Sequence, residues 1–219
     1  MIRGAIFDAD GTLLDSMGMW ATAEVRYLAT MGIQARPGLS EVLFDMTLME
    51  GAAFLQREYG LPLTPEEVAA GINRVIYTFY QREVRAKPGA AAFLEGLRQR
   101  GVRVTLATNT DRAVITEGLR STGLLPLIEQ VFTCGELGTS KRASAKIFDT
   151  ARDWMGTATE ETWVFEDAVH AARTAGEAGY PVAGVADPYS DQRALKQVSR
   201  LYLNDLTDLA GFLRLTGKG

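Results

Sequence analysis

The chain has 219 residues, of which 47% are hydrophobic and 23% charged, and its formal net charge is −4. This balance is typical of a globular protein with room for one α/β domain and a smaller insertion. The acidic net charge argues against a broad basic surface for nucleic acid or for anionic lipid. The sequence has a lone cysteine, Cys134, and no apolar stretch of about 18 residues. We therefore expect a soluble, cytoplasmic protein without disulfides, membrane contact or a nucleic-acid partner.

Short apolar runs, each ended by small or polar residues, alternate with helical patterns along most of the chain. Predicted strands cover residues 2–7, 102–107, 130–133, 162–165, 181–185 and 201–203. Predicted helices between and after them cover residues 88–100, 111–123, 144–155, 168–178 and 206–213. Strands that alternate with helices in this way predict a Rossmann-like parallel sheet in an α/β fold.

Residues 16–85 interrupt this alternation with helical periodicity alone. The pattern predicts helices over 19–31, 39–44, 50–59 and 65–84. Since a connection from strand to helix normally takes about two to six residues, an insertion this long should be a helical cap. The expected core is then residues 1–15 and 86–219. Open sheets bind ligands at the carboxyl ends of their strands, so we expect the cap to act as a lid, with Ser16 and residues 85–87 as hinges.

Two carboxylates follow the first predicted strand at a spacing of two. Asp8 and Asp10 can face one site because alternate residues of an extended chain share a face. Gly11 permits a sharp turn after them, and the Thr12 hydroxyl is expected to close this loop by a hydrogen bond. Two close carboxylates repel unless a cation or a proton separates them. Mg²⁺ suits oxygen ligands and would bring a phosphate near Asp8. The pattern favours phosphoryl transfer with Asp8 as the nucleophile.

The run Asp-Ala-Asp-Gly-Thr-Leu-Leu-Asp-Ser at residues 8–16 resembles motif I of the haloacid dehalogenase-like phosphohydrolase superfamily. Later segments match the family's other motifs in order, so the resemblance covers essentially the whole chain. It implies that Asp8 is the nucleophile, and that Asp10 is first a general acid and then a general base. It also implies Mg²⁺ held by Asp8, by the backbone carbonyl of Asp10 and by later acids.

The ends of two further predicted strands match motifs II and IV of the family. Thr108 falls at motif II, where a hydroxyl would bind a phosphoryl oxygen, and Asn109 is a second candidate for substrate binding. Glu166 and Asp167 fall at motif IV and would complete the Mg²⁺ ligands. The alternative for Asp167 is a cap on the helix that follows, but a cap does not account for two successive acids.

Motif III should supply a lysine that neutralises the phosphoryl oxygens. The family pattern has two prolines here and an aromatic residue six positions after the lysine; this chain has neither proline, and Phe148 lies seven positions after Lys141. We assign Lys141 to the catalytic and substrate-binding role, with Arg142 and Lys146 as alternatives. His170, the only histidine, has no expected catalytic role.

Related activities are separated by particular residues. A dehalogenase does not use an acid at Asp10 or a metal at the Glu166–Asp167 pair. A phosphonatase needs a cap lysine, and residues 16–85 contain none. A β-phosphoglucomutase would place a histidine where Trp20 stands and an arginine in the cap, and residues 39–51 contain no arginine.

We therefore predict a Mg²⁺-dependent phosphatase similar to the β-phosphoglucomutase and phosphoglycolate phosphatase group. It would hydrolyse a small phosphomonoester, such as a sugar phosphate, through an aspartyl-phosphate. The alternatives are a phosphosugar mutase and, from another class, a catalytically idle binding domain. The retention of four carboxylates at strand ends argues against the idle domain.

Overall fold

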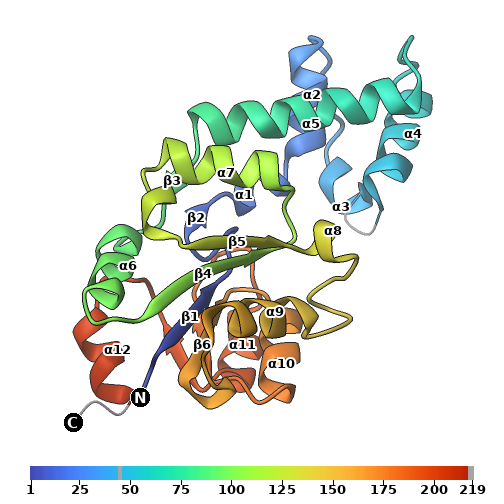
Figure 1. Ribbon diagram of the computed structural model, residues 1–219. Coiled ribbons are helices and arrows are strands. Elements are labelled where there is room, and N and C mark those ends of the chain that lie inside the picture. The colour runs from blue at the N-terminus through green and yellow to red at the C-terminus, as the bar shows by residue number, and fades with distance from the viewer. Residues whose placement is uncertain (44–45, 217–219) are drawn as a thin grey trace. The chain divides into compact units, whose positions relative to one another are not determined.

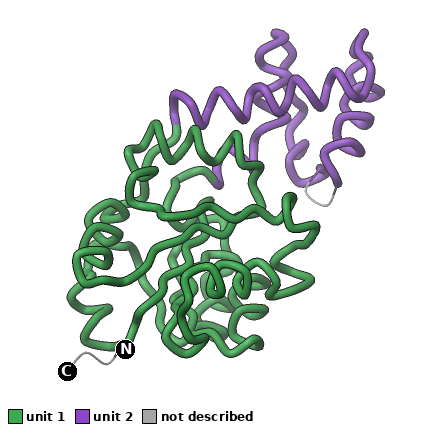
Figure 2. Tube along the Cα trace, viewed as in Figure 1, with its two compact units in different colours: residues 1–16, 84–219 green, residues 17–83 purple. Residues whose placement is uncertain are grey.

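The computed structural model describes residues 1–43 and 46–216 (Figure 1). The chain forms two compact units (Figure 2). The first consists of Met1–Ser16 together with the chain from Val84 onward, and the second is Met17–Glu83. No helix among the described residues has the length and hydropathy that crossing a membrane requires.

A six-stranded parallel sheet forms the centre of the first unit, in the order β5-β4-β1-β6-β7-β8. Its strands are β1 (Gly4–Phe7), β4 (Arg103–Thr108), β5 (Gln130–Thr133), β6 (Thr162–Glu166), β7 (Val182–Val185) and β8 (Leu201–Leu203). All pairs of neighbouring strands run parallel. The predicted Rossmann-like parallel sheet is confirmed, with strand ends that differ from the expected ones by two residues at most.

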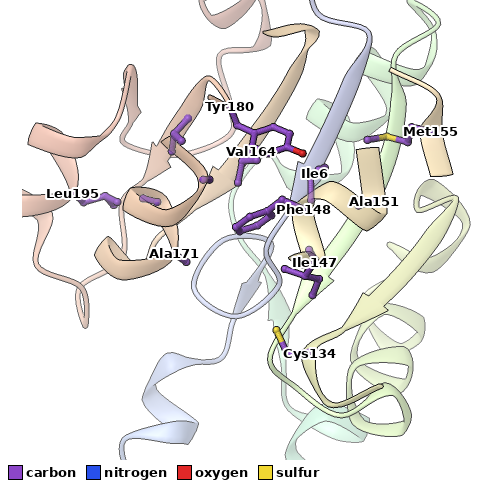
Figure 3. Packing of buried hydrophobic residues seen from close by; sticks show 14 residues of the cluster. Ile6, Cys134, Ile147, Phe148, Ala151, Met155, Val164, Ala171, Tyr180 and Leu195 are labelled. Carbon is purple, nitrogen blue, oxygen red and sulfur yellow. The ribbon is translucent and has the colours of Figure 1, made fainter. Parts of the chain in front are cut away.

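The central strands are buried because helices cover both faces of the sheet. All residues of β1, β6 and β7 are buried, as expected for parallel strands with two covered faces. In the register of β1 and β6, Ile6 lies beside Val164 and Phe7 beside Phe165. Ile6 and Val164 join the buried cluster shown in Figure 3. Phe7 stacks on Phe165 at a centroid distance of 4.1 Å.

Two sets of helices supply these covers. Helices α9 (Lys146–Met155), α10 (Val169–Glu177) and α11 (Gln192–Val198) bring Phe148, Ala171 and Leu195 to the cluster of Figure 3. Helices α6 (Ala90–Arg98) and α12 (Leu209–Leu215) bring Phe93 and Phe212 against Phe165, with ring centroids 5.6 Å and 5.3 Å away. The first unit also contains α7 (Arg112–Ser121), α8 (Cys134–Leu137) and 3-10 turns at Leu125–Leu127 and Thr159–Glu161.

Some short elements differ from the expectation. Helices α8 and α11 were not predicted, nor was a pair of two-residue strands, β2 (Leu14–Asp15) and β3 (Arg85–Ala86). These two strands pair antiparallel, with Leu14 opposite Ala86 and Asp15 opposite Arg85. The pair lies where the chain leaves the first unit and where it returns to it.

The second unit is entirely helical among its described residues. It contains α1 (Met17–Trp20), α2 (Ala23–Thr30), α3 (Leu39–Leu43), α4 (Leu48–Glu58) and α5 (Pro65–Arg82). The prediction of one helix over 19–31 is wrong. The Thr22 hydroxyl donates to the Gly18 carbonyl at 2.6 Å, and Thr22 has non-helical backbone angles, so the chain breaks between α1 and α2. The predicted end of the next helix at Phe44 lies outside the described residues.

Local sequence signals begin the two longest helices of this unit. Thr47 with Glu50 and Thr64 with Glu67 each form a reciprocal capping box, at the start of α4 and of α5 respectively. Each box satisfies backbone N–H groups that have no partner within the helix. The apolar side of α5 then buries Ile72, and α2 buries Leu28.

Candidate active site

The carboxyl ends of three neighbouring strands meet at one edge of the sheet. Asp8 directly follows β1, Thr108 ends β4, and Glu166 ends β6 with Asp167 after it. Since β1 lies between β4 and β6, the three strand ends present their side chains side by side. The Asp8 amide extends this pairing by donating to the Phe165 carbonyl at 2.9 Å.

Backbone hydrogen bonds close the loop that carries Asp8 and Asp10. The Gly11 amide donates to the Leu14 carbonyl at 2.9 Å, and the Leu14 amide donates to the Ala9 carbonyl at 2.8 Å. Gly11 has a φ of +83°, which a residue without Cβ adopts at little cost. The expectation that the Thr12 hydroxyl closes the loop is wrong. Thr12 Oγ1 is buried and has no hydrogen-bond partner within the described residues.

Lys141 lies between two of the buried carboxylates. Its ammonium donates to Asp8 Oδ1, and to Glu166 Oε1 at 2.6 Å. The Lys141 side chain is 2% exposed, and a buried ammonium needs such partners because burial alone would cost several kcal/mol. Burial disfavours the charged form, but the carboxylates of Asp8 and Glu166 outweigh this effect and raise the pKa of Lys141. Lys141 therefore stays a cation.

The carboxyl groups around Lys141 titrate near neutrality. Burial raises the pKa of Asp8 to about 7; Lys141 opposes this rise, and Asp167 and Asp10 add to it. Burial also raises the pKa of Glu166 to about 7, again against the effect of Lys141. For Asp167, burial and the Glu166 charge raise the pKa to about 7, while a hydrogen bond from Ser190 lowers it. The single positive charge of Lys141 is thus too little to balance three ionised carboxylates.

Three of these acids are arranged as a cation would require. Asp8, Glu166 and Asp167 each offer one oxygen, and these oxygens lie within 4.8 Å of one another. Carboxylate oxygens suit a hard divalent cation, which would also relieve the repulsion that raises their pKa values. Asp167 accepts a hydrogen bond from Ser190 Oγ at 2.8 Å, and α10 has no side-chain cap. The residues present therefore fit a metal site.

Asp10 lies near Asp8, but its carboxylate is not in this group of three. Asp10 Oδ1 accepts a hydrogen bond from Ser16 Oγ, and Asp10 Oδ2 accepts one from Thr110 Oγ1, both at 2.6 Å. Its charge still contributes to the raised pKa of Asp8. The use of Asp10 as a metal ligand through its backbone carbonyl stays a prediction.

The two predicted motif II residues differ in burial. Thr108 is 1% exposed, and its Oγ1 accepts a hydrogen bond from the Thr110 amide at 3.0 Å. Asn109 is exposed. The structure thus puts Thr108 at the end of the strand beside Asp8 and leaves Asn109 on the surface of the loop.

Of the three cationic candidates for motif III, Lys141 alone reaches Asp8. Arg142 is exposed, and Lys146 Nζ donates instead to the Leu137 carbonyl at 2.8 Å. His170 is half-buried on α10; burial and the charges of Arg142 and Lys141 lower the pKa of His170. A neutral imidazole is what these surroundings favour.

Sequence reasoning missed two sets of residues that contact the expected site. Thr110 holds Asp10, and its place two residues after Thr108 is a signal that could have been used. Ser190 holds Asp167 from the turn after β7, where Lys87 Nζ pairs with Asp187 Oδ2 at 2.8 Å. No motif identifies Ser190, Lys87 or Asp187, because their role depends on the turn that precedes the unpredicted helix α11.

Comparison with known proteins agrees with this architecture. Residues 2–179 match the family model of the haloacid dehalogenase-like hydrolases. A phosphoglycolate phosphatase from Agrobacterium fabrum is 24% identical over 223 residues, which cover 98% of this chain and 94% of that protein.

Two solved structures share the fold over nearly their whole length. The crystal structure of CbbY from Rhodobacter sphaeroides in complex with phosphate has a TM-score of 0.76 and 20% identity, covering 95% of this chain and 96% of that chain. A β-phosphoglucomutase from Clostridium difficile has a TM-score of 0.72 and 15% identity, covering 99% and 97%. The predicted family is confirmed: the chain belongs to the haloacid dehalogenase-like hydrolases.

Proposed function

We propose that this protein is a Mg²⁺-dependent phosphatase that hydrolyses a small phosphomonoester, such as a sugar phosphate, through an aspartyl-phosphate on Asp8. The observation that carries the proposal is the buried Asp8 carboxylate, which is paired with Lys141 and grouped with Glu166 and Asp167. Names of similar proteins support the same class: one is a phosphoglycolate phosphatase, and another was solved with phosphate.

In this proposal Asp8, Glu166, Asp167 and the Asp10 backbone carbonyl hold the cation. When bound, Mg²⁺ would supply positive charge to phosphate oxygens and keep the surrounding carboxyl groups ionised. Lys141, fixed as a cation by its two carboxylates, stabilises negative charge on the phosphoryl oxygens. The Thr108 hydroxyl binds one of these oxygens, with Asn109 as a second contact from the loop.

The first step transfers the phosphoryl group to the protein. An Asp8 oxygen attacks phosphorus, the bond from phosphorus to the ester oxygen breaks, and Asp10 gives its proton to the departing alcohol. Asp10 must enter this step protonated. The Ser16 and Thr110 hydroxyls hold its two oxygens 2.6 Å away, which limits how far that carboxyl group can turn.

The second step releases phosphate. Asp10, now ionised, takes a proton from a water molecule, whose oxygen attacks the phosphorus of the aspartyl-phosphate. The bond between phosphorus and the Asp8 oxygen breaks, and the Asp8 carboxylate is regenerated. Lys141 stabilises the same oxygens in both steps, because negative charge lies on these phosphoryl oxygens in each transition state.

We also propose that the helical unit Met17–Glu83 acts as a cap during turnover. Support comes from connectivity: the unit is inserted between β2 and β3, directly after the loop that carries Asp10. A cap of this kind would exclude bulk water from the aspartyl-phosphate and contribute the residues that choose the substrate.

The test uses the purified protein with p-nitrophenyl phosphate and a panel of sugar phosphates. We expect turnover that needs Mg²⁺ and stops when EDTA removes it. Asp8→Asn should abolish turnover, because an amide is a poor nucleophile. Substantial activity in Asp8→Asn, with the same dependence on Mg²⁺, would exclude covalent catalysis by Asp8.

The same panel separates hydrolysis from mutase activity. With β-glucose 1-phosphate as substrate, a phosphatase releases inorganic phosphate, whereas a phosphosugar mutase forms the 6-phosphate and releases little phosphate. We expect phosphate release. Absence of both products across the panel would favour a catalytically idle domain.

A further inference from the structure

The turn between β7 and α11 contacts the group of acids from outside the predicted motifs. We propose that the turn formed by Asp187–Ser190 positions Asp167 for cation binding, through the Ser190 hydroxyl and under the control of the buried Lys87–Asp187 ion pair. This inference rests on the proposed function, since it assumes that Asp167 is a metal ligand. Ser190, Asp187 and Lys87 are positioning residues in this arrangement and not ligands of the cation.

Ser190 makes the direct contact. Its Oγ donates to Asp167 Oδ2 at 2.8 Å, and the Asp167 residue is 3% exposed. A short side chain such as Asp turns about two bonds, and one hydrogen bond to one oxygen restricts that rotation. The hydrogen bond therefore favours one orientation of a carboxylate whose ligand oxygen lies close to those of Asp8 and Glu166. Partners of this kind commonly orient metal ligands.

Asp187 organises the turn that presents Ser190. The Ser190 amide donates to the Asp187 carbonyl at 3.1 Å, which closes the turn. The Tyr189 amide donates to Asp187 Oδ1 at 3.0 Å, the local hydrogen bond by which aspartate stabilises turns. Pro188, the second residue of the turn, favours this backbone because its ring fixes φ. The position of Ser190 thus depends on the Asp187 side chain.

Lys87 neutralises Asp187 inside the protein. Lys87 Nζ donates to Asp187 Oδ2 and to the Ala186 carbonyl, both at 2.8 Å. The side chains of Lys87 and Asp187 are 10% and 1% exposed. The Lys87 backbone amide donates to the Leu13 carbonyl at 2.8 Å, close after the loop of Asp8 and Asp10. One residue therefore connects the turn that carries Ser190 to the chain that leaves the Asp8 loop.

This arrangement has a chemical consequence for the acids. Asp187 is itself negative and contributes to the electrostatic environment of Asp167. Lys87 keeps that second charge paired. Without Lys87, the Asp187 carboxylate would be buried without its cation, and the turn would rearrange to reach water. The hydrogen bond from Ser190 to Asp167 would then be lost.

The experiment measures the Mg²⁺ dissociation constant of the EDTA-treated, dialysed full chain by isothermal titration calorimetry, with melting temperature as a second readout. We expect Ser190→Ala to weaken Mg²⁺ binding by about 10-fold and Ser190→Thr, which keeps the hydroxyl, to restore most of it. Ser199→Ala is the matched control: Ser199 Oγ is buried near the end of α11 and has no hydrogen-bond partner among described residues. This control should bind Mg²⁺ as the wild type does.

The Lys87 part is tested with a double-mutant cycle. Lys87→Met should also weaken Mg²⁺ binding, and the double variant Lys87→Met with Ser190→Ala should lose less than the product of the two single losses, because both act through one turn. Independent losses would overturn the role given to Lys87.

The outcomes separate this inference from the proposed function. If the wild type binds Mg²⁺ and Ser190→Ala binds it equally well, the positioning role is overturned and the proposed function stands. A fall in melting temperature without a change in Mg²⁺ affinity would show a merely structural role and overturn it too. If the wild type itself binds no Mg²⁺, the metal-dependent function fails and this inference fails with it.

Discussion

The ammonium of Lys141 forms hydrogen bonds with two carboxylates that come from two different strands. Asp8 follows β1 and Glu166 ends β6, and Lys141 hydrogen-bonds to both. The lysine arrives from the loop before α9, so three separate segments meet at one charge. Lys141 reaches Asp8 although Phe148 lies seven positions after it and neither proline of the family pattern is present. The loop needs only to deliver one ammonium to the right place.

We expect Lys141→Ala to lower kcat/KM by about 100-fold or more, because it removes charge stabilisation of the phosphoryl oxygens. Arg142→Ala is the matched control, since Arg142 is adjacent and exposed and should leave kcat/KM nearly unchanged. Steady-state kinetics of both variants, with circular dichroism to verify folding, make the comparison. If Lys141→Ala leaves kcat/KM nearly unchanged while Arg142→Ala or Lys146→Ala lowers it strongly, the motif III assignment is wrong.

The location of Asp10 illustrates what a spacing rule can and cannot predict at the residue scale. Alternation along an extended chain predicts that Asp8 and Asp10 lie close, and their charges do interact. The rule does not predict the direction of the Asp10 carboxylate, which depends on hydroxyl donors from Ser16 and Thr110. Ser16 lies six residues after Asp10 and Thr110 lies just after the end of another strand, so the alternation of neighbouring residues does not identify either donor.

At the scale of elements, segments with an apolar or periodic pattern were predictable, whereas two-residue strands and short polar helices were not. Strand β6 was predicted to within one residue of its observed ends, because its buried residues include the apolar run Trp-Val-Phe. Strands β2 and β3 have two residues each, too few for any periodicity. Helix α11 is short and polar, so it has little apolar periodicity. Asp191 caps its start, where the Asp191 side chain accepts a hydrogen bond from the Ala194 amide at 3.0 Å.

Helix α5 provides a prediction at this scale. Its capping box at Thr64 satisfies backbone N–H groups at the start of an 18-residue helix. We expect Thr64→Ala to lower the free energy of unfolding by about 1 kcal/mol, measured by urea titration. Thr78→Ala in the same helix is the control. The Thr78 hydroxyl donates to the Arg74 carbonyl one turn earlier, within the helix, so its loss should change that free energy by less than about 0.5 kcal/mol. Equal losses would mean that the cap contributes nothing specific.

At the scale of the whole molecule, the buried acids link stability to pH and to the cation. The pKa values of Asp8, Glu166 and Asp167 are raised to about 7 from ordinary values of 3.8, 4.5 and 3.8. The native state therefore binds more protons than the unfolded chain between these limits. Protonation of these acids in the native state therefore stabilises the fold when no cation is bound. This stabilisation is fully present below about pH 4 and is lost as the pH rises through about 7.

Mg²⁺ should reverse this trend, because it binds the ionised carboxylates. We expect the rise in melting temperature on adding Mg²⁺ to be small near about pH 5 and large near about pH 8. Differential scanning calorimetry with and without Mg²⁺ measures it, and Na⁺ at matched ionic strength is the control for screening. A Mg²⁺ effect independent of pH would contradict the assignment of these acids as ligands.

The two-residue ladder between β2 and β3 makes the helical unit replaceable in principle. Since Leu14 and Ala86 are paired neighbours, the ends of the intervening insertion meet at the same point of the core whatever lies between them. Lengthening such an insertion costs little, only about 0.6 kcal/mol for each doubling. Helical units of other sizes could be grafted there without disturbing the strand order on which Asp8, Glu166 and Asp167 depend. If the helical unit is the cap proposed above, the choice of substrate could be engineered separately from the chemistry of the phosphoryl group.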